Sequence, residues 1–159
     1  MSELRVGIGV DAHAFEDGVP LVLGGVSIDY PRGLAGHSDG DVVAHALIDA
    51  ILGAANLGDI GSLFPSGDEQ YRGASSLDLL WEAYREVRDA GWGLVNADCV
   101  LVGEEPRIGE IRGEMSERLG AALGVDAGQV AVRATTTDGL GFTGRGEGLA
   151  AHAVALLRR

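Results

Sequence analysis

Apolar residues recur at two different spacings along the chain, and the spacing predicts the secondary structure. Segments in the pattern expected of strands cover residues 4–10, 94–102 and a run that starts at residue 130. Two short apolar runs on either side of Gly24 and Gly25 predict a hairpin over residues 20–30. The alanine-rich run 149–157 fits a helix and a strand equally well, so periodicity does not decide its state.

Helical spacing predicts three helices. The first begins near Asp39 and Asp41, whose carboxylates suit a helix N-terminus, and its expected core face comprises Val43, Leu47, Ala50, Ile51 and Ala54. The second begins at a capping-box-like run with Asp in place of Glu, and its expected core stripe comprises Leu77, Leu80, Trp81, Tyr84 and Val87. The ranges expected for the three helices are 41–55, 75–91 and 108–123. Strands and helices together place the chain in the α/β (α+β) class.

Length and composition favour a single domain over residues 1–159, with 46% hydrophobic residues available for a core. Cys99 is the only cysteine and lies in an apolar run, so we expect a packing residue and no intrachain disulfide. The N-terminus carries no apolar signal-peptide region, and no run is apolar enough to span a membrane. These features favour a cytoplasmic protein.

The net charge of −12 argues against nucleic acid and anionic membranes as partners. All 12 cationic side chains are arginine, because the chain contains no lysine. An anionic substrate would therefore have to be held by a metal ion, by backbone amides or by arginine.

Two short polar segments could together bind a metal ion. Asp11 and His13 are two residues apart on a strand and so face the same side, while His45 lies off the expected core face of the first helix. Asp41 and Asp49 flank His45 by one helical turn and could orient its second nitrogen. One oxygen and two nitrogens suit zinc with an open fourth position, which is typical of catalytic sites. The alternative is an ordinary hydrogen-bonded strand end.

Two loops carry further candidate chemistry. Residues 58–68 offer Asp59 and Asp68 as polar contacts, although a solvated connector would have the same composition. After the strand from residue 130, consecutive threonines and Asp138 precede several glycines, which suits a phosphate with a bridging hard cation; a flexible loop is the alternative. Residues 139–144 match G-x-G-x-x-G, but too little chain follows for a dinucleotide-binding unit.

Four motifs in this order resemble the 2-C-methyl-D-erythritol 2,4-cyclodiphosphate synthase family over nearly the whole chain. They are residues 9–15 (GVDAHAF), 37–47 (HSDGDVVAHAL), 57–65 (LGDIGSLFP) and 134–148 (ATTTDGLGFTGRGEG). The resemblance implies cyclisation of 4-diphosphocytidyl-2-C-methyl-D-erythritol 2-phosphate with release of CMP, in the non-mevalonate route to isoprenoids. It also implies a mixed sheet of about four main strands covered on one side by helices, a small hairpin, and a homotrimer whose sheets face the threefold axis.

The resemblance assigns roles to individual residues. Zinc would bind Asp11, His13 and His45; magnesium or manganese would bind Asp138; His37 and Thr136 would stabilise the transition state. The substrate-binding set implied by the family comprises Asp11, His13, His37, Ser38, Asp59, Ile60, Gly61, Phe64, Pro65, Ser66, Gly67, Asp68, Gly103, Glu104, Glu105, Pro106, Arg107, Ile108, Ala134, Thr135, Thr136, Thr137, Asp138, Phe142 and Arg145. The nucleotide and sugar loops would come from neighbouring subunits.

Three positions depart from the family pattern. Asp138 stands where a glutamate is usual, Gly139 replaces a lysine of many members, and Arg107 replaces the lysine of the cytidine loop. The shorter carboxylate would hold its cation closer or through water, and activity is expected to survive. Two other functions fit the same residues: a metal-dependent phosphohydrolase, which would release free phosphate, and a non-catalytic trimeric nucleotide-binding protein.

Overall fold

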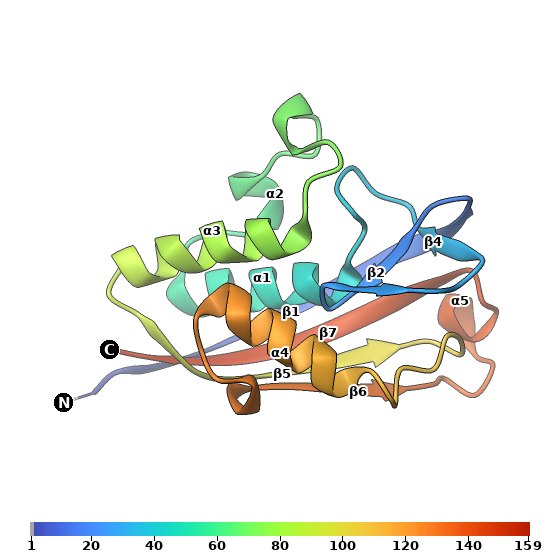
Figure 1. Ribbon diagram of the computed structural model, residues 1–159. Helices are drawn as coiled ribbons and strands as arrows, with labels where there is room; N and C mark the ends of the chain where they lie inside the picture. Colours follow the sequence, from blue (N-terminus) through green and yellow to red (C-terminus); the bar gives the residue numbers. More distant parts are fainter. Residues whose placement is uncertain (1) are drawn as a thin grey trace.

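A mixed five-stranded sheet forms one layer of the molecule, and helices cover one of its faces (Figure 1). The structure is a computed structural model that describes residues 2–159. The strand order is β4-β1-β7-β5-β6, with bounds β1 Leu4–Asp17, β4 Arg32–Leu34, β5 Gly93–Val102, β6 Val130–Thr135 and β7 Gly148–Arg158. The pair β5 and β6 is parallel, and the other neighbours are antiparallel. The expected α/β class, with four long strands in the sheet, is confirmed.

The predicted hairpin is confirmed as a separate two-stranded sheet of β2 (Leu21–Leu23) and β3 (Val26–Ile28), with Gly24 and Gly25 both at positive φ in the turn. The ambiguous C-terminal run is strand β7, which lies between β1 and β5. Strand β1 is longer than the expected residues 4–10, because residues beyond Val10 pair with β7 and then with β4. Asp11 and His13 therefore lie inside the strand and not at its end.

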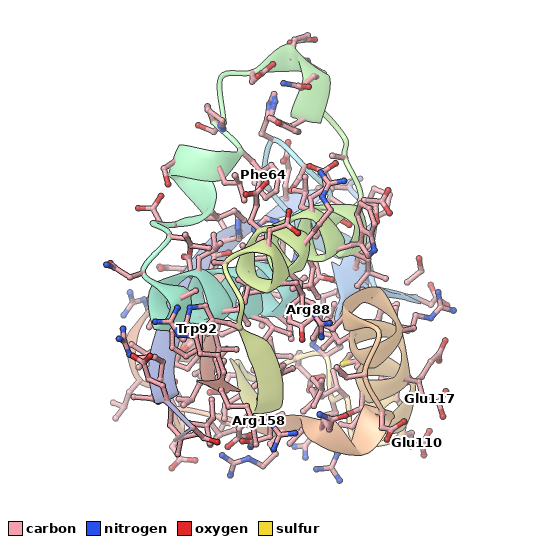
Figure 2. All side chains as sticks on the ribbon, turned by 90° about the vertical axis from the view of Figure 1, so that its left-hand side faces the viewer. Phe64, Arg88, Trp92, Glu110, Glu117 and Arg158 are labelled. Carbon is pink, nitrogen blue, oxygen red and sulfur yellow. The ribbon has the colours of Figure 1, made fainter. Side chains whose placement is uncertain are left out.

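Of the three long helices, α1 and α4 pack on the sheet and α3 packs on these two helices, while four short helical turns connect the elements. Their bounds are α1 Val42–Ala55, α2 Ile60–Leu63, η1 Glu69–Tyr71, α3 Ser76–Asp89, α4 Arg112–Leu123, η2 Ala127–Gln129 and α5 Gly141–Gly144. The third expected helix starts at Arg112 and not at residue 108, because residues 103–111 form a turn that buries Ile108 before the helix begins. The expected loop 58–68 contains α2 and projects from the body with η1; Phe64 lies at the base of this projection (Figure 2).

Helix α1 is buried on nearly every side, with 12 buried residues, and His45 is one of them although it lies off the expected core face. Two glycines on β1 allow this close packing. A Cβ on Gly9 would lie 1.8 Å from the carbonyl oxygen of Ala46, and one on Gly7 would lie 2.1 Å from that of Ala50. Larger side chains would push α1 away from β1. The glycines therefore set the distance at which His45 lies above Asp11.

Helix α3, the second of the three expected helices, differs from expectation at two points. Ser75 is its N-cap residue but makes no side-chain capping bond, so the expected capping box is absent. Trp81 does not belong to the core: it is 52% exposed, and the guanidinium of Arg85 stacks over its ring. Leu80, Tyr84 and Val87 are buried as expected.

The sheet face away from the helices carries an exposed apolar stripe, which comprises Leu4, Val6, Ile8, Val10 and Val154. Their exposed fractions lie between 43% and 69%. Cys99 is on the buried face, as expected, and burial raises the pKa of its thiol to about 12. None of the helices formed by residues 2–159 is long and apolar enough to cross a membrane.

Candidate active site

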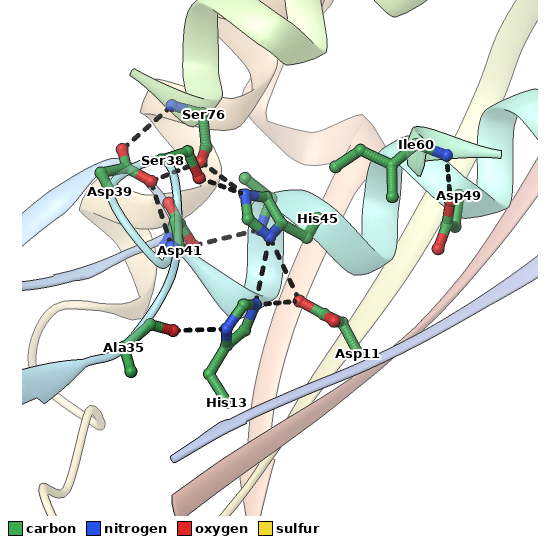
Figure 3. A network of polar contacts seen from close by, with 12 residues as sticks. Asp11, His13, Ala35, Ser38, Asp39, Asp41, His45, Asp49, Ile60 and Ser76 are labelled. Carbon is green, nitrogen blue, oxygen red and sulfur yellow. Dashed lines mark hydrogen bonds and ion pairs between the residues drawn. The ribbon is translucent and has the colours of Figure 1, made fainter. Parts of the chain in front are cut away.

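Three predicted metal ligands converge at one point between β1 and α1 (Figure 3). Asp11 Oδ2 lies 2.8 Å from His13 Nε2 and 3.2 Å from His45 Nδ1, and the two histidine nitrogens are 3.3 Å apart. Alternation on β1 places Asp11 and His13 on the same face, and the close approach of α1 brings His45 over them. Residues 32 positions apart in sequence thus share one potential ligand site.

The backbone fixes the orientation of His13. Its Nδ1 lies 2.6 Å from the carbonyl oxygen of Ala35, which can only accept a hydrogen bond. In the neutral ring Nδ1 therefore carries the proton, and the lone pair of Nε2 points to Asp11 and His45. This is the tautomer that a metal ligand requires.

The two carboxylates one turn away from His45 do not orient its ring, so that expectation is wrong. Asp41 is fully buried and accepts hydrogen bonds from the backbone N–H groups of Gly24, Gly25 and Ala44, which anchors the hairpin to the start of α1. Burial raises the pKa of Asp41 to about 6. Asp49 accepts a hydrogen bond of 2.7 Å from the backbone N–H of Ile60 and so holds the start of α2.

His45 Nε2 faces serine hydroxyls instead. Ser76 Oγ lies 2.8 Å away and Ser38 Oγ lies 3.1 Å away. Sequence periodicity could not show this contact, because Ser76 belongs to a different helix and meets His45 only in the folded chain.

Charge in the site favours a cation. Burial opposes ionisation of Asp11, but its close contacts with the imidazoles of His13 and His45 outweigh burial and lower the pKa of Asp11 to about 2. The hydrogen bond with Asp11 in turn raises the pKa of His13. An ionised carboxylate next to two imidazoles is the donor set of many zinc sites.

The spacing of the donor atoms also fits a metal ion. Ligands about 2.0–2.1 Å from a tetrahedral zinc lie roughly 3.3 Å from one another. The three separations here, 2.8, 3.2 and 3.3 Å, approach this value without any movement of the backbone. Three protein ligands leave one position open, as in catalytic sites.

We expect zinc to stabilise the protein more strongly as the pH rises. His13 must lose its proton to bind the ion, and its raised pKa makes the proton a competitor on the acid side. In the metal-free protein, the contribution of His13 to folding stability changes with pH in the opposite direction. The folded state holds the His13 proton more tightly than the unfolded state, in which the histidine pKa is about 6.5. This proton therefore stabilises the fold at low pH, and the stabilisation is lost as the pH rises through the raised pKa of His13.

The measurement is the difference in Tm between zinc-loaded and chelator-treated protein from about pH 5.5 to 8. The difference should increase with pH. A constant or shrinking difference would contradict His13 as a ligand that must be deprotonated.

The three predicted ligands line a pocket together with residues from the projecting segment, which comprises residues 58–71. The walls of the pocket comprise Asp11, His13, His37, Ser38, His45, Ile60, Gly61, Phe64, Ser66, Tyr71 and Leu79. Tyr71 and Leu79 were not expected; Tyr71 packs edge-on against Phe64, with ring centroids 5.2 Å apart. His37 Nε2 lies 2.7 Å from the carbonyl oxygen of Asp68 and so joins two loops at the rim. The Asp59 and Asp68 carboxylates cap α2 and η1, and Pro65 and Gly67 do not line the pocket.

The residues expected at the nucleotide form a second pocket, whose walls comprise Gly103, Glu104, Pro106, Arg107, Ile108, Gly109, Ala134, Thr135 and Thr136. Glu104 accepts a hydrogen bond of 3.2 Å from the backbone N–H of Thr137, which joins the two loops. Thr136 Oγ1 donates to Asp138 Oδ1 at 3.2 Å. Glu105 and Arg145 line a neighbouring depression, and Phe142 is 42% exposed.

The two pockets lie on different strands of one sheet. The strand register places Asp11 opposite Ala151, Ala151 opposite Leu101, and Leu101 opposite Ala134. Three strand spacings of about 4.8 Å then separate the metal ligands from the second pocket by roughly 14 Å. The two pockets share no wall residue. One chain therefore does not bring its metal ligands and its Thr136 together.

Comparison with known proteins gives consistent matches over almost the full chain. The model of the YgbB family matches residues 4–158. The 2-C-methyl-D-erythritol 2,4-cyclodiphosphate synthase of Moorella thermoacetica is 58% identical over 154 residues, which cover 97% of this chain and 94% of that protein. The synthase of Rubrobacter xylanophilus is 59% identical over 162 residues, which cover 100% of this chain and 98% of that protein.

Solved structures agree with the sequence matches. A 2C-methyl-D-erythritol-2,4-cyclodiphosphate synthase in its CDP-bound form superposes with a TM-score of 0.87 at 39% identity, covering 96% of this chain and 99% of the other. The bifunctional IspDF of Campylobacter jejuni superposes with a TM-score of 0.96 at 43% identity. That match covers 99% of this chain, which spans 43% of the bifunctional chain.

Proposed function

Because this chain belongs to the YgbB family and has the function of the 2-C-methyl-D-erythritol 2,4-cyclodiphosphate synthases of isoprenoid biosynthesis, we propose that Asp11, His13 and His45 hold zinc for that reaction. The observation that supports this most directly is the convergence of their three donor atoms at the wall of a pocket. The chain would act as one catalytic domain over residues 1–159.

The reaction is an internal phosphoryl transfer. An oxygen of the substrate's 2-phosphate forms a bond to the β-phosphorus, the bond from that phosphorus to the bridging oxygen breaks, and CMP leaves with the bonding electrons. The attacking phosphate is already ionised, so the enzyme needs no general base. Positioning in line and neutralisation of charge are then the main tasks of the protein.

The pocket residues divide these tasks. His37 and Ser38, on the loop above the metal ligands, would contact the phosphates, and His37 would stabilise the transition state with Thr136 of the nucleotide loop. When bound, zinc and a magnesium or manganese ion at Asp138 would supply Lewis-acid polarisation and charge neutralisation. Asp138 is close to Thr136 already, so the residues for the second ion and for transition-state contact share one turn.

The projecting segment would bind the methylerythritol phosphate. Ile60, Phe64 and Leu79 supply an apolar wall for its carbon skeleton, and the Asp59 carboxylate is exposed nearby for its hydroxyl groups. The hydrogen bond from the Ile60 N–H to Asp49 fixes the position of this wall relative to α1. The other residues of this segment that would contact the methylerythritol phosphate are Gly61, Pro65, Ser66, Gly67 and Asp68.

The second pocket would bind the cytidine diphosphate part. Turn residues 103–108 and residues 134–138 line it or border it, and Phe142 and Arg145 would close the nucleotide side. Arg107 offers a planar guanidinium where the family pattern has a lysine. Two relatives of this fold were solved with CDP bound, which supports a cytidine nucleotide as a ligand of this chain.

A homotrimer with active sites between subunits would join the two pockets. The pockets of one chain lie roughly 14 Å apart in the sheet, so neither is complete alone. The exposed apolar stripe formed by Leu4, Val6, Ile8, Val10 and Val154 provides a surface for the threefold contact. The net charge of −12 disfavours nucleic acid and anionic membranes as further partners. The unpaired Cys99 fits a reducing cytoplasm.

Phosphorus NMR of the products tests the reaction. With 4-diphosphocytidyl-2-C-methyl-D-erythritol 2-phosphate, zinc and magnesium, we expect CMP and a cyclic diphosphate in equal amounts and no inorganic phosphate. Chelator-treated protein should form neither product. Inorganic phosphate as the main product would instead identify a phosphohydrolase, and no turnover would favour a nucleotide-binding protein.

A further inference from the structure

Ser76 occupies an unusual position for the first residue of a helix. Its side chain is fully buried, although serine at the start of α3 could reach solvent. Its hydroxyl lies 2.8 Å from His45 Nε2 and also hydrogen-bonds to Asp39 Oδ1 (Figure 3). A buried hydroxyl with two polar partners is held in one orientation.

The direction of these hydrogen bonds follows from the available protons. A carboxylate can only accept, so the single hydroxyl proton of Ser76 is donated to Asp39. Ser76 Oγ must then accept from His45, whose Nε2 carries the ring proton. The lone pair of His45 Nδ1 consequently faces Asp11 and His13, where the metal would bind.

Asp39 is itself held in place by backbone groups. Its Oδ2 accepts from the N–H of Ser76 at 3.0 Å, and its Oδ1 accepts from the N–H of Asp41 at 3.1 Å. Its own N–H donates to the carbonyl oxygen of Ala74 at 3.1 Å. The carboxylate therefore connects the loop before α1 to the start of α3 and has little freedom to turn.

We propose that Ser76 and Asp39 are positioning residues for the metal centre, which orient His45 and fix its tautomer through the chain Asp39–Ser76–His45. The inference rests on the proposed zinc site. Metal-binding histidines commonly donate their second N–H to a carboxylate, a carbonyl or water, and loss of that partner weakens metal binding by about 10–100-fold. His13 uses the Ala35 carbonyl for this purpose, and His45 uses a carboxylate through an intervening hydroxyl.

The test is zinc affinity, measured by chelator competition, in Ser76→Ala and Ser38→Ala. Ser76→Ala keeps the backbone N–H that binds Asp39 and places a good helix former in α3, so the fold should be retained. Ser38→Ala is the matched control, because it removes the other hydroxyl near His45 Nε2, at 3.1 Å. We expect zinc binding to weaken by about 10–100-fold in Ser76→Ala and by less than about threefold in Ser38→Ala.

A second readout separates orientation from a general effect on folding. In the zinc-loaded wild type and in Ser38→Ala, the His45 Nε2 proton should give a slowly exchanging imidazole signal in nitrogen-correlated NMR, and Ser76→Ala should lose it. Equal zinc affinity in Ser76→Ala and the wild type, or a loss confined to Ser38→Ala, would overturn the proposal. Failure of the wild type to bind zinc would instead overturn the metal site itself.

Discussion

Replacing His45 with alanine is expected to abolish tight zinc binding and to lower the rate of CMP release by at least about 10³-fold. The imidazole supplies one of three donor atoms, and two ligands alone do not make a stable tetrahedral site. The lost ion would also leave the Asp11 carboxylate in the pocket without its cation, so the phosphates would meet negative charge instead of positive charge. Zinc content after dialysis and the initial rate of CMP release measure the two effects.

His37→Ala is the matched control, because His37 lines the same pocket but lies outside the ligand group. This variant should keep one zinc ion per chain and lose activity through the missing phosphate contact. If His45→Ala and His37→Ala retained equal zinc, the assignment of His45 as a ligand would be wrong.

Mixing two inactive variants is expected to restore activity if the sites lie between subunits. His45→Ala removes the metal ligand from one pocket, and Thr136→Ala removes a hydroxyl from the other, some 14 Å away in the same chain. In trimers formed at random from equal amounts, about one quarter of the sites would combine an intact metal pocket with an intact nucleotide pocket from its neighbour. CMP release should therefore recover to roughly that fraction of the wild-type rate.

The experiment requires unfolding or subunit exchange before mixing, so that mixed trimers form. A mixture of His45→Ala with Asp11→Ala is the control, because both variants lack the same pocket and no combination repairs it. A mixture of the first pair that never exceeds the activity of its components would show that each chain uses its own two pockets.

Local sequence signals predicted the elements whose stability is local. The Gly24–Gly25 turn forms its hairpin, Asp41 caps α1, and α1 ends at Ala55, the expected last residue. These features depend on neighbouring residues. By contrast, β7 could be called neither helix nor strand, because its state depends on pairing with β1 and β5 far along the chain.

In the candidate site, too, local spacing predicted some features, while contacts between distant residues determined the others. Spacing on β1 predicted that Asp11 and His13 face one way, and the structure adds His45 at the expected point. The helical spacing of Asp41 and Asp49 suggested that they orient His45, but both carboxylates bind backbone N–H groups instead. The partner of His45 is Ser76, on a helix whose position relative to α1 depends on contacts between residues far apart in sequence.

Anomalous diffraction from zinc-loaded crystals, recorded above and below the zinc absorption edge, tests the central claim most directly. The structure predicts one strong peak per chain, at about 2.0–2.2 Å from each of Asp11 Oδ2, His13 Nε2 and His45 Nδ1. Zinc bound only elsewhere, or no peak among these three atoms in protein that makes the cyclic product, would contradict it.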